Sequence, residues 1–188
     1  MQVPNKIVSI DAETDGLWGK PFAIAAVVYE YRAAMDRGVD GKRPAGFAVT
    51  DQLLVRLPDA EVTNEWVKEN VLPSISGVIV THNDYEEMLS EFSFFYNAHK
   101  SGTVLWHMGH VVESFLFREC VRLGYIGEWD APYTPIDVSM TLREKGYDPA
   151  SVDAVMDSLG LMKPLGSTHD PMYDCICAFR VWERLNGF

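Results

Sequence analysis

The chain of 188 residues carries a net charge of −11, from 16 Lys and Arg against 27 Asp and Glu. This balance is not typical of a protein that coats duplex nucleic acid, because such proteins bind phosphates through many basic residues that displace counterions. It does not exclude a nuclease, since an enzyme that gathers carboxylates around metal ions gains local positive charge from those ions. The hydrophobic content of 47% suits the core of a single domain over residues 1–188.

No segment of the sequence is expected to enter a membrane. The longest apolar run, residues 22–29, is far shorter than the roughly 20 residues that span a bilayer. The first residues do not resemble a secretory signal, because a strand-like run that ends in acids follows at once. We therefore expect a soluble cytoplasmic protein, of a bacterium or a phage-infected host cell, with no membrane partner.

The three cysteines do not indicate a disulfide framework or a zinc site. Their number is odd, and Cys175 and Cys177 are two residues apart on a predicted helix, where their side chains diverge. We expect buried thiols.

The first third of the chain predicts three neighbouring strands, at residues 5–13, 21–31 and 47–57. The middle one is almost continuously apolar, which indicates a central strand. Turn signals such as Asp-Gly-Lys-Arg-Pro fill the link over residues 32–46. Three such strands in succession predict an antiparallel meander.

The rest of the chain predicts alternating helices and strands. Apolar residues three and four apart mark the helices, and short β-branched runs mark the strands. The expected elements are helix 63–72, helix 85–100, strand 103–107, helix 111–123, strand 134–138 and helix 153–159. A final helix is expected after Asp170, a good N-cap, with Pro171 at its first position. The pattern predicts an α/β fold with a mixed sheet.

The first strand ends in a pair of acids, Asp11 and Glu13, followed by Thr14 and Gly16. Side chains at i and i+2 of a strand share a face, so the two carboxylates point the same way. Oxygen ligands of this kind suit magnesium or manganese. On its own, the pattern is more often a strand end whose two acids face solvent.

The second pattern lies at the start of the final helix. His169 precedes the helix and Asp174 lies in its first full turn, where the positive end of the helix dipole favours a carboxylate. The pair offers a metal ligand and a general base one turn apart. Alone, it is more often an ordinary helix start with a loop histidine.

In this order and at this spacing, the two patterns resemble the DEDDh superfamily of 3′→5′ exonucleases. The family pattern is Asp-x-Glu-Thr-x-Gly, a middle acidic motif, and His-x4-Asp. The matching positions are Asp11, Glu13, Thr14, Gly16, His169 and Asp174. The resemblance implies a ribonuclease H-like fold, in which a three-strand antiparallel meander continues into parallel strands with helices on both faces. It is closest to compact, phage-type members.

The middle acid departs from the family pattern of His-Asn-x-x-Phe-Asp, and two glutamates are candidates. Glu87 follows His82-Asn83 at the expected distance. Glu113 follows the strand at 103–107, which itself follows a long helix, as in the family layout. We favour Glu113, and we interpret His82-Asn83 as the start of the helix at 85–100. Either glutamate would replace the usual aspartate, as in some viral exonucleases.

The resemblance also implies the roles of these residues. Asp11, Glu13, Glu113 and Asp174 would hold two divalent ions, Mg²⁺ or Mn²⁺, and His169 would act as general base. Thr14, Gly16, Leu17 and Trp18 would bind substrate, with Leu17 packed against the terminal base and Trp18 adding stacking. The expected activity releases 5′-mononucleotides from the 3′ end of DNA or RNA. A homodimer is possible.

Two other functions remain open at this point: a ribonuclease H-like binding module without chemistry, and a phosphodiesterase for very short oligonucleotides or nucleotide signals. His107 and His110 are interpreted as a strand-end and a loop histidine. Asp137 is a supporting acid at a strand end. The basic residues Arg32, Arg37, Lys42 and Arg43 either guide a strand or, as we favour, form a solvated hairpin tip.

Overall fold

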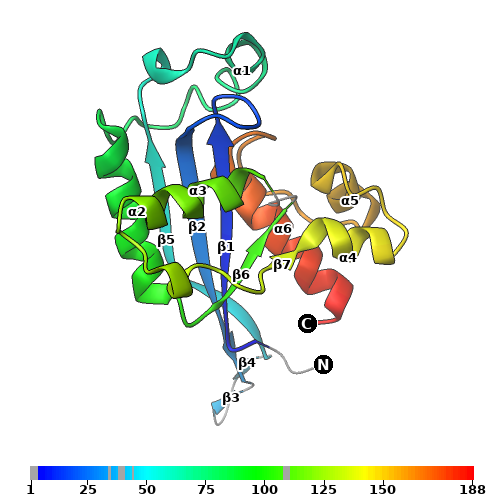
Figure 1. Ribbon diagram of the computed structural model, residues 1–188. Coiled ribbons are helices and arrows are strands. Elements are labelled where there is room, and N and C mark those ends of the chain that lie inside the picture. The colour runs from blue at the N-terminus through cyan, green and yellow to red at the C-terminus, as the bar shows by residue number, and fades with distance from the viewer. Residues whose placement is uncertain (1–3, 34, 38–40, 44, 108–110) are drawn as a thin grey trace.

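Figure 1 shows the computed structural model, which describes residues 4–33, 35–37, 41–43, 45–107 and 111–188. Five strands form one mixed sheet with the order β5-β2-β1-β6-β7. Their bounds are β1 (Lys6–Thr14), β2 (Pro21–Arg32), β5 (Gly46–Arg56), β6 (Thr103–Trp106) and β7 (Ile136–Asp137).

Strand directions follow the prediction. β1, β2 and β5 form an antiparallel meander, and β6 and β7 join it parallel to β1. The predicted turn at 32–46 contains two further short strands, β3 (Met35–Arg37) and β4 (Gly41–Arg43), which pair with each other. In Figure 1 this small hairpin projects from the end of the sheet where β1 begins.

Helices cover both faces of the sheet, as predicted (Figure 1). They are α1 (Glu65–Asn70), α2 (Tyr85–His99), α3 (Val112–Arg122), α4 (Val138–Glu144), α5 (Val152–Ser158) and α6 (Pro171–Asn186), with short 3-10 turns η1 (Asp59–Glu61) and η2 (Glu128–Asp130). α2 and α3 pack on one face; α4, α5 and α6 pack on the other. None of the described helices is long and apolar enough to cross a bilayer.

The alternation of β1 determines which core each side chain enters. Val8 and Ile10 are buried with residues of α2 and α3, whereas Ile7 is buried with residues of α4, α5 and α6. Asp11 continues the register of Ile7 and therefore points towards the α6 face.

Three expectations about local structure need correction. The strand predicted at 134–138 has only two residues, because the Asp137 carboxylate accepts a hydrogen bond from Ser139 N at 2.9 Å and starts α4, a helix that was not predicted. The helix predicted from residue 63 begins at Glu65, with Asn64 as its N-cap. Its Trp66 is 58% exposed. The three cysteines are buried free thiols, as expected.

Candidate metal centre

The two ends of the chain meet where β1 lies against α6. Ser9, on the same face of β1 as Asp11, donates a buried hydrogen bond from Oγ to the carbonyl of Cys175 at 2.8 Å. The Cys175 thiol lies 3.5 Å from the Ser9 carbonyl and 3.4 Å from that of Ala25. These contacts fix the second turn of α6 against the centre of the sheet, beside the end of β1.

Asp11, Glu13 and Asp174 converge at this junction. Each offers a carboxylate oxygen, and these three oxygens lie within 4.8 Å of one another. Asp170 caps α6 through Met172 N at 3.0 Å, which orients the first turn of the helix. Asp174 Oδ2 accepts the backbone N–H of His169 at 2.9 Å. The acids of the two sequence patterns thus form one cluster.

Glu113 enters the same cleft from the first turn of α3. The cleft has a volume of about 600 Å³, and we call it the acidic cleft. Its acidic residues are Asp11, Glu13, Glu113, Asp153 and Asp174. Glu113 is only 2% exposed, and its Oε2 has no hydrogen-bond partner among the described residues. An orphaned buried carboxylate oxygen is costly unless a cation binds it.

Glu87, the alternative middle acid, lies elsewhere. It is exposed on α2 and lines a separate hollow together with Glu91 and His82. The ring of His82 lies 2.9 Å from the Glu91 carboxylate. Asp84 caps α2 through Glu86 N and Glu87 N, both at 2.9 Å. The His-Asn stretch is therefore the entry to α2, and of the two glutamates the structure places Glu113 in the cleft.

The acids of the cleft resist ionisation in the metal-free protein. Burial, followed by the charge of Asp174, raises the pKa values of Asp11 and Glu13 well above their usual ranges. Burial raises the pKa of Asp174 to about 7, although the His169 N–H opposes the rise. Burial raises the pKa of Glu113 to about 8, although its own N–H and that of Ala12 oppose it. The described lining of the cleft contains no Lys or Arg, so these residues fit divalent cations.

His169 lies at the mouth of the acidic cleft. Its side chain is 44% exposed, and Nδ1 lies 3.8 Å from Oε1 of Glu13. Its φ is 69°, the left-handed region that non-glycine residues seldom adopt. The exposed indole of Trp66 meets the imidazole edge to face, with ring centroids 6.0 Å apart. Trp66 was not predicted as a site residue, because it belongs to neither sequence pattern.

The loop after β1 is tied to the start of α1. The Asp15 carboxylate accepts hydrogen bonds from Thr63 N at 3.0 Å and Asn64 N at 2.7 Å. Gly16 has a φ of 81°, a left-handed conformation that favours glycine, and a Cβ there would displace the end of the Asn64 side chain, whose Nδ2 would lie 2.7 Å away. Thr14 is buried.

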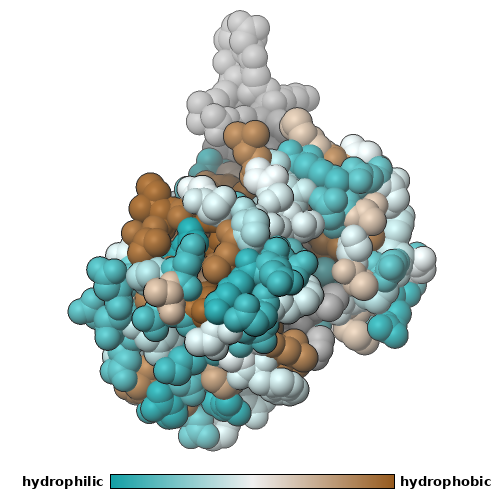
Figure 2. Space-filling view, turned by 90° about the horizontal axis from the view of Figure 1, so that it is seen from above, coloured by the Kyte–Doolittle hydropathy of each residue, from teal (hydrophilic) through white to brown (hydrophobic). Residues whose placement is uncertain are grey.

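Of the two exposed residues that follow Gly16, Leu17 lines the acidic cleft. Trp18 is 74% exposed and is not among the lining residues. Figure 2 looks onto this end of the molecule, where hydrophilic and hydrophobic side chains lie side by side.

The remaining candidates lie at the margins. His107 follows β6 and hydrogen-bonds through Nε2 to the carbonyl of Pro149 at 2.9 Å, which agrees with a strand-end histidine. His110 lies outside the described residues. Arg32 ends β2 at the opposite end of the sheet, and the side chains of Arg37, Lys42 and Arg43 lie outside the described part of the structure.

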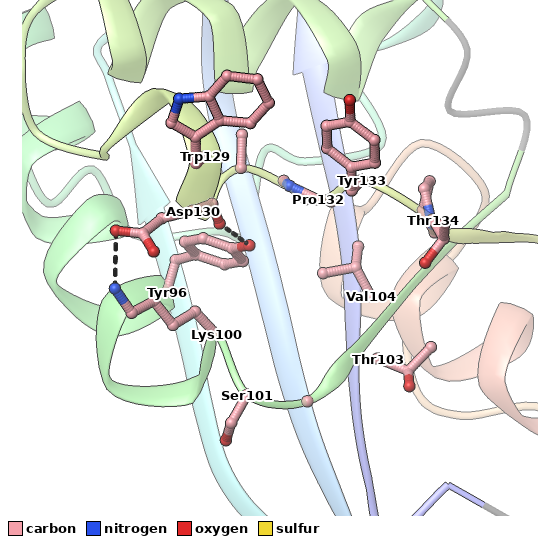
Figure 3. Close-up of a pocket in the computed structure, with 13 residues that line it drawn as sticks. Tyr96, Lys100, Ser101, Thr103, Val104, Trp129, Asp130, Pro132, Tyr133 and Thr134 are labelled. Atoms are coloured by element: carbon pink, nitrogen blue, oxygen red, sulfur yellow. Dashed lines mark hydrogen bonds and ion pairs between the residues drawn. The ribbon is translucent and has the colours of Figure 1, made fainter.

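A second pocket, of about 490 Å³, lies at the other end of β6 (Figure 3). The exposed rings of Trp129 and Tyr133 stand at its rim. Its single acid, Asp130, is paired with Lys100 at 2.8 Å, and Tyr96 donates to the Asp130 carbonyl at 2.7 Å. One neutralised acid does not form a metal centre.

Comparison with known proteins supports the architecture. No protein-family model matches the sequence, and no curated protein matches it. Among solved structures, the nuclease domain of 3′hExo, a DEDDh family member bound to rAMP, superposes with a TM-score of 0.63 at 12% identity. The match covers 99% of this chain and 94% of that one. The chain has the fold of a DEDDh exonuclease domain. In this DEDDh fold the acidic cleft contains all four carboxylates that the sequence patterns predicted.

Proposed function

We propose that the protein is a metal-dependent 3′→5′ exonuclease that removes 5′-mononucleotides from a nucleic acid. The observation that carries this proposal is the convergence of Asp11, Glu13 and Asp174, which come from opposite ends of the chain, within 4.8 Å in one cleft. A binding module that has lost its chemistry has no need to bury such a costly cluster. The filled set of acids and the adjacent His169 therefore favour an enzyme.

Four carboxylates would hold the metal: Asp11, Glu13, Glu113 and Asp174. Two Mg²⁺ or Mn²⁺ ions, when bound, supply an activated water and the charge that stabilises the leaving oxygen. The protein fits such ions because its acids have raised pKa values and Glu113 Oε2 has no hydrogen-bond partner in the part of the chain that the structure describes. In the absence of metal these acids repel one another. Bound cations would offset this repulsion and stabilise the folded protein.

His169 is the proposed general base. Two described histidines line the cleft: His107 is bonded through Nε2 to the Pro149 carbonyl, whereas His169 has a half-exposed ring with Nδ1 3.8 Å from Glu13 Oε1. A base at this position accepts the proton of the attacking water. The Glu13 carboxylate, 3.8 Å away, stabilises the imidazolium that results.

The terminal nucleotide would contact Leu17 and Trp66. Leu17 lines the cleft, the exposed Trp66 ring meets His169, and an aromatic face stacks on any base. Thr14 and Gly16 hold the backbone that carries Leu17, and Trp18 offers further stacking outside the cleft. The similar nuclease domain was solved with rAMP bound, which agrees with a mononucleotide-binding site in this fold.

Very short substrates are a second candidate, favoured by the absence of basic residues. The described lining of the cleft has no Lys or Arg to bind a second or third phosphate. Affinity for a long strand comes mainly from such contacts. Oligonucleotides of a few residues, or small nucleotide phosphodiesters, need only the metal centre and one stacking surface.

Digestion of 5′-labelled oligonucleotides with Mn²⁺ tests the proposal. DNA and RNA of two to about twenty nucleotides are compared, each with a free 3′ hydroxyl and with a blocked 3′ phosphate. We expect a ladder that shortens one nucleotide at a time from free 3′ ends only. Equal cleavage of blocked ends would indicate an endonuclease, and no cleavage of any substrate would reject the proposed activity.

A further inference from the structure

His169 is carried by an irregular segment, residues 160–168, which we call the strap. It connects α5 to the start of α6 and contains no helix or strand. At its start, Leu161 packs against the core on the α6 side of the sheet, but further along Met162 is exposed and Leu165 is 100% exposed. Hydrophobic burial therefore does not hold the middle of the strap in place.

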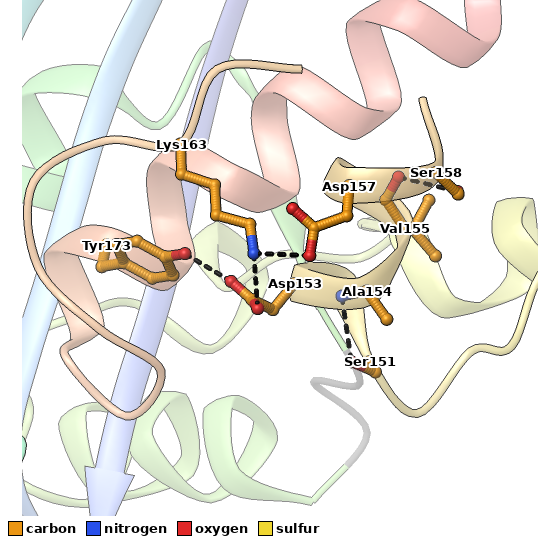
Figure 4. A network of polar contacts seen from close by, with 8 residues as sticks. All are labelled: Ser151, Asp153, Ala154, Val155, Asp157, Ser158, Lys163 and Tyr173. Carbon is orange, nitrogen blue, oxygen red and sulfur yellow. Dashed lines mark hydrogen bonds and ion pairs between the residues drawn. The ribbon is translucent and has the colours of Figure 1, made fainter. Parts of the chain in front are cut away.

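Polar contacts hold it instead. Lys163 extends from the strap and donates from Nζ to Asp153 Oδ2 and Asp157 Oδ2, both at 2.8 Å. These two acids lie one turn apart on α5, so a single ammonium group bridges them. Arg180 of α6 donates to the carbonyl of Met162, next to Lys163. Figure 4 shows Lys163 reaching across from the strap to α5.

The same network extends to the helix that follows His169. The other oxygen of Asp153 accepts the hydroxyl of Tyr173, a buried residue in the first turn of α6 (Figure 4). Asp153 also lines the acidic cleft. One carboxylate thus joins the strap, α5 and the beginning of α6 around the cleft.

His169 needs such external support because of its own backbone. Its left-handed φ of 69° is unfavourable for a histidine and persists only where neighbouring structure imposes it. Asp174 and the N-cap Asp170 hold the side of His169 that faces α6. On the strap side the nearest contact is the backbone hydrogen bond from Asp170 N to the Ser167 carbonyl at 3.0 Å. Lys163 is the strap residue whose side chain ties the strap to α5.

We propose that Lys163 is a positioning residue: through Asp153, Asp157 and Tyr173 it fixes the strap, and so places the His169 ring over the acid cluster. This inference rests on the proposed function for its effect on catalysis. Its structural part, the order of the strap, does not depend on any activity. Lys163 itself touches neither the metal ligands nor the expected substrate position.

The test compares Lys163→Met with Lys163→Arg and with a matched control, Lys6→Met. Lys6 has a similarly exposed side chain, 25% against 30%, and pairs with Glu30 at the opposite end of the sheet. We expect Lys163→Met to lower kcat by about tenfold with KM within about twofold, since a misplaced base affects the chemical step. Lys163→Arg keeps the charge and should restore most of kcat.

Hydrogen exchange gives a second readout without metal or substrate. Backbone amides of the strap and of His169 should exchange about tenfold faster in Lys163→Met than in the wild-type protein. Their exchange rates should be unchanged in Lys6→Met. Equal kcat in Lys163→Met and Lys6→Met would overturn the catalytic part of the inference, and unchanged strap exchange would overturn all of it. If the wild-type protein cleaves no substrate, the proposed function fails, and the exchange result alone still decides whether Lys163 orders the strap.

Discussion

The carboxylates and the histidine of the acidic cleft are held by different kinds of structure. Asp11 and Asp174 lie on a central strand and a long helix, which Ser9 and Cys175 join through a buried hydrogen bond. His169 lies at the end of an irregular strap that polar contacts hold in place. The acids lie on regular elements although their charges repel, whereas His169, the proposed base, lies on an irregular segment with a left-handed φ of 69°.

This contrast shows that different forces hold the carboxylate cluster and the segment that carries His169. Four carboxylates that repel one another stay together only on elements whose packing outweighs the repulsion. A base that must meet water and substrate needs exposure, and exposure removes the apolar contacts that would fix it. Changes to the acids should therefore alter metal binding and stability together, whereas changes to the strap should alter catalysis alone.

The largest effect is expected for Asp11→Asn. Loss of this charge at the centre of the cluster should lower the cleavage rate on the order of a thousandfold, because the metal ligands act as a unit. The same change should stabilise the metal-free protein, because it removes one repelling charge. Rates and thermal melts measured beside Asp51→Asn, an exposed acid of β5 paired with His99, check both results. A metal-free Asp11→Asn protein less stable than wild type would contradict the account.

The metal-free protein should lose stability as the pH rises. Folded pKa values of about 7 for Asp174 and about 8 for Glu113 lie above the unfolded values, so the folded state holds extra protons in this range. The free energy of unfolding should therefore fall between about pH 4.5 and about pH 8, by on the order of a few kcal/mol. Urea unfolding in chelator at several pH values measures it, and Glu113→Gln should flatten the profile. Stability that rises over this range would show that the acids are not destabilised.

His169→Ala should lower kcat by roughly a hundredfold, because general-base catalysis is lost while the metal ligands remain. Mn²⁺ affinity and the melting temperature should stay close to those of the wild-type protein. This outcome would separate the base from the carboxylates. A parallel loss of Mn²⁺ binding would instead assign His169 to the metal centre.

Trp66→Ala should have the smallest effect on activity, raising KM by about tenfold because one stacking contact with the terminal base is lost. Stability should change little, since Trp66 is 58% exposed. Trp129→Ala is the matched control, because Trp129 is an exposed tryptophan beside the distant pocket of Figure 3. Equal KM values for the two variants would remove Trp66 from the site.

The parts of the site that sequence predicted depend on local rules. The alternation of a strand places Asp11 and Glu13 on one face, and the Asp170-Pro171 pair marks the start of α6. The preference for Glu113 over Glu87 came instead from the family layout that the resemblance implies, in which a helix and a strand precede the middle acid, and the structure places Glu113 in the cleft.

The parts that sequence did not predict depend on distant contacts. Trp66 follows helical spacing, yet α1 is too short and too peripheral to bury it, so it turns towards His169. Predicting the hydrogen bonds of Lys163 would require knowing where the strap passes relative to α5 and α6. Neither residue belongs to a motif, and only the path of the chain brings Trp66 to His169 and Lys163 to Asp153.

Titration of Mn²⁺ into the metal-free protein, followed by calorimetry, tests the central claim most directly. The account predicts saturable binding of about two ions by the wild-type chain, since four carboxylates of this kind suit a pair of divalent cations. It also predicts at least tenfold weaker binding by Glu113→Gln. Glu87→Gln, the matched change on the exposed face of α2, should bind as the wild-type protein does. No saturable binding by the wild-type protein, or a loss confined to Glu87→Gln, would contradict the claim that strand, helix and Glu113 form one metal centre.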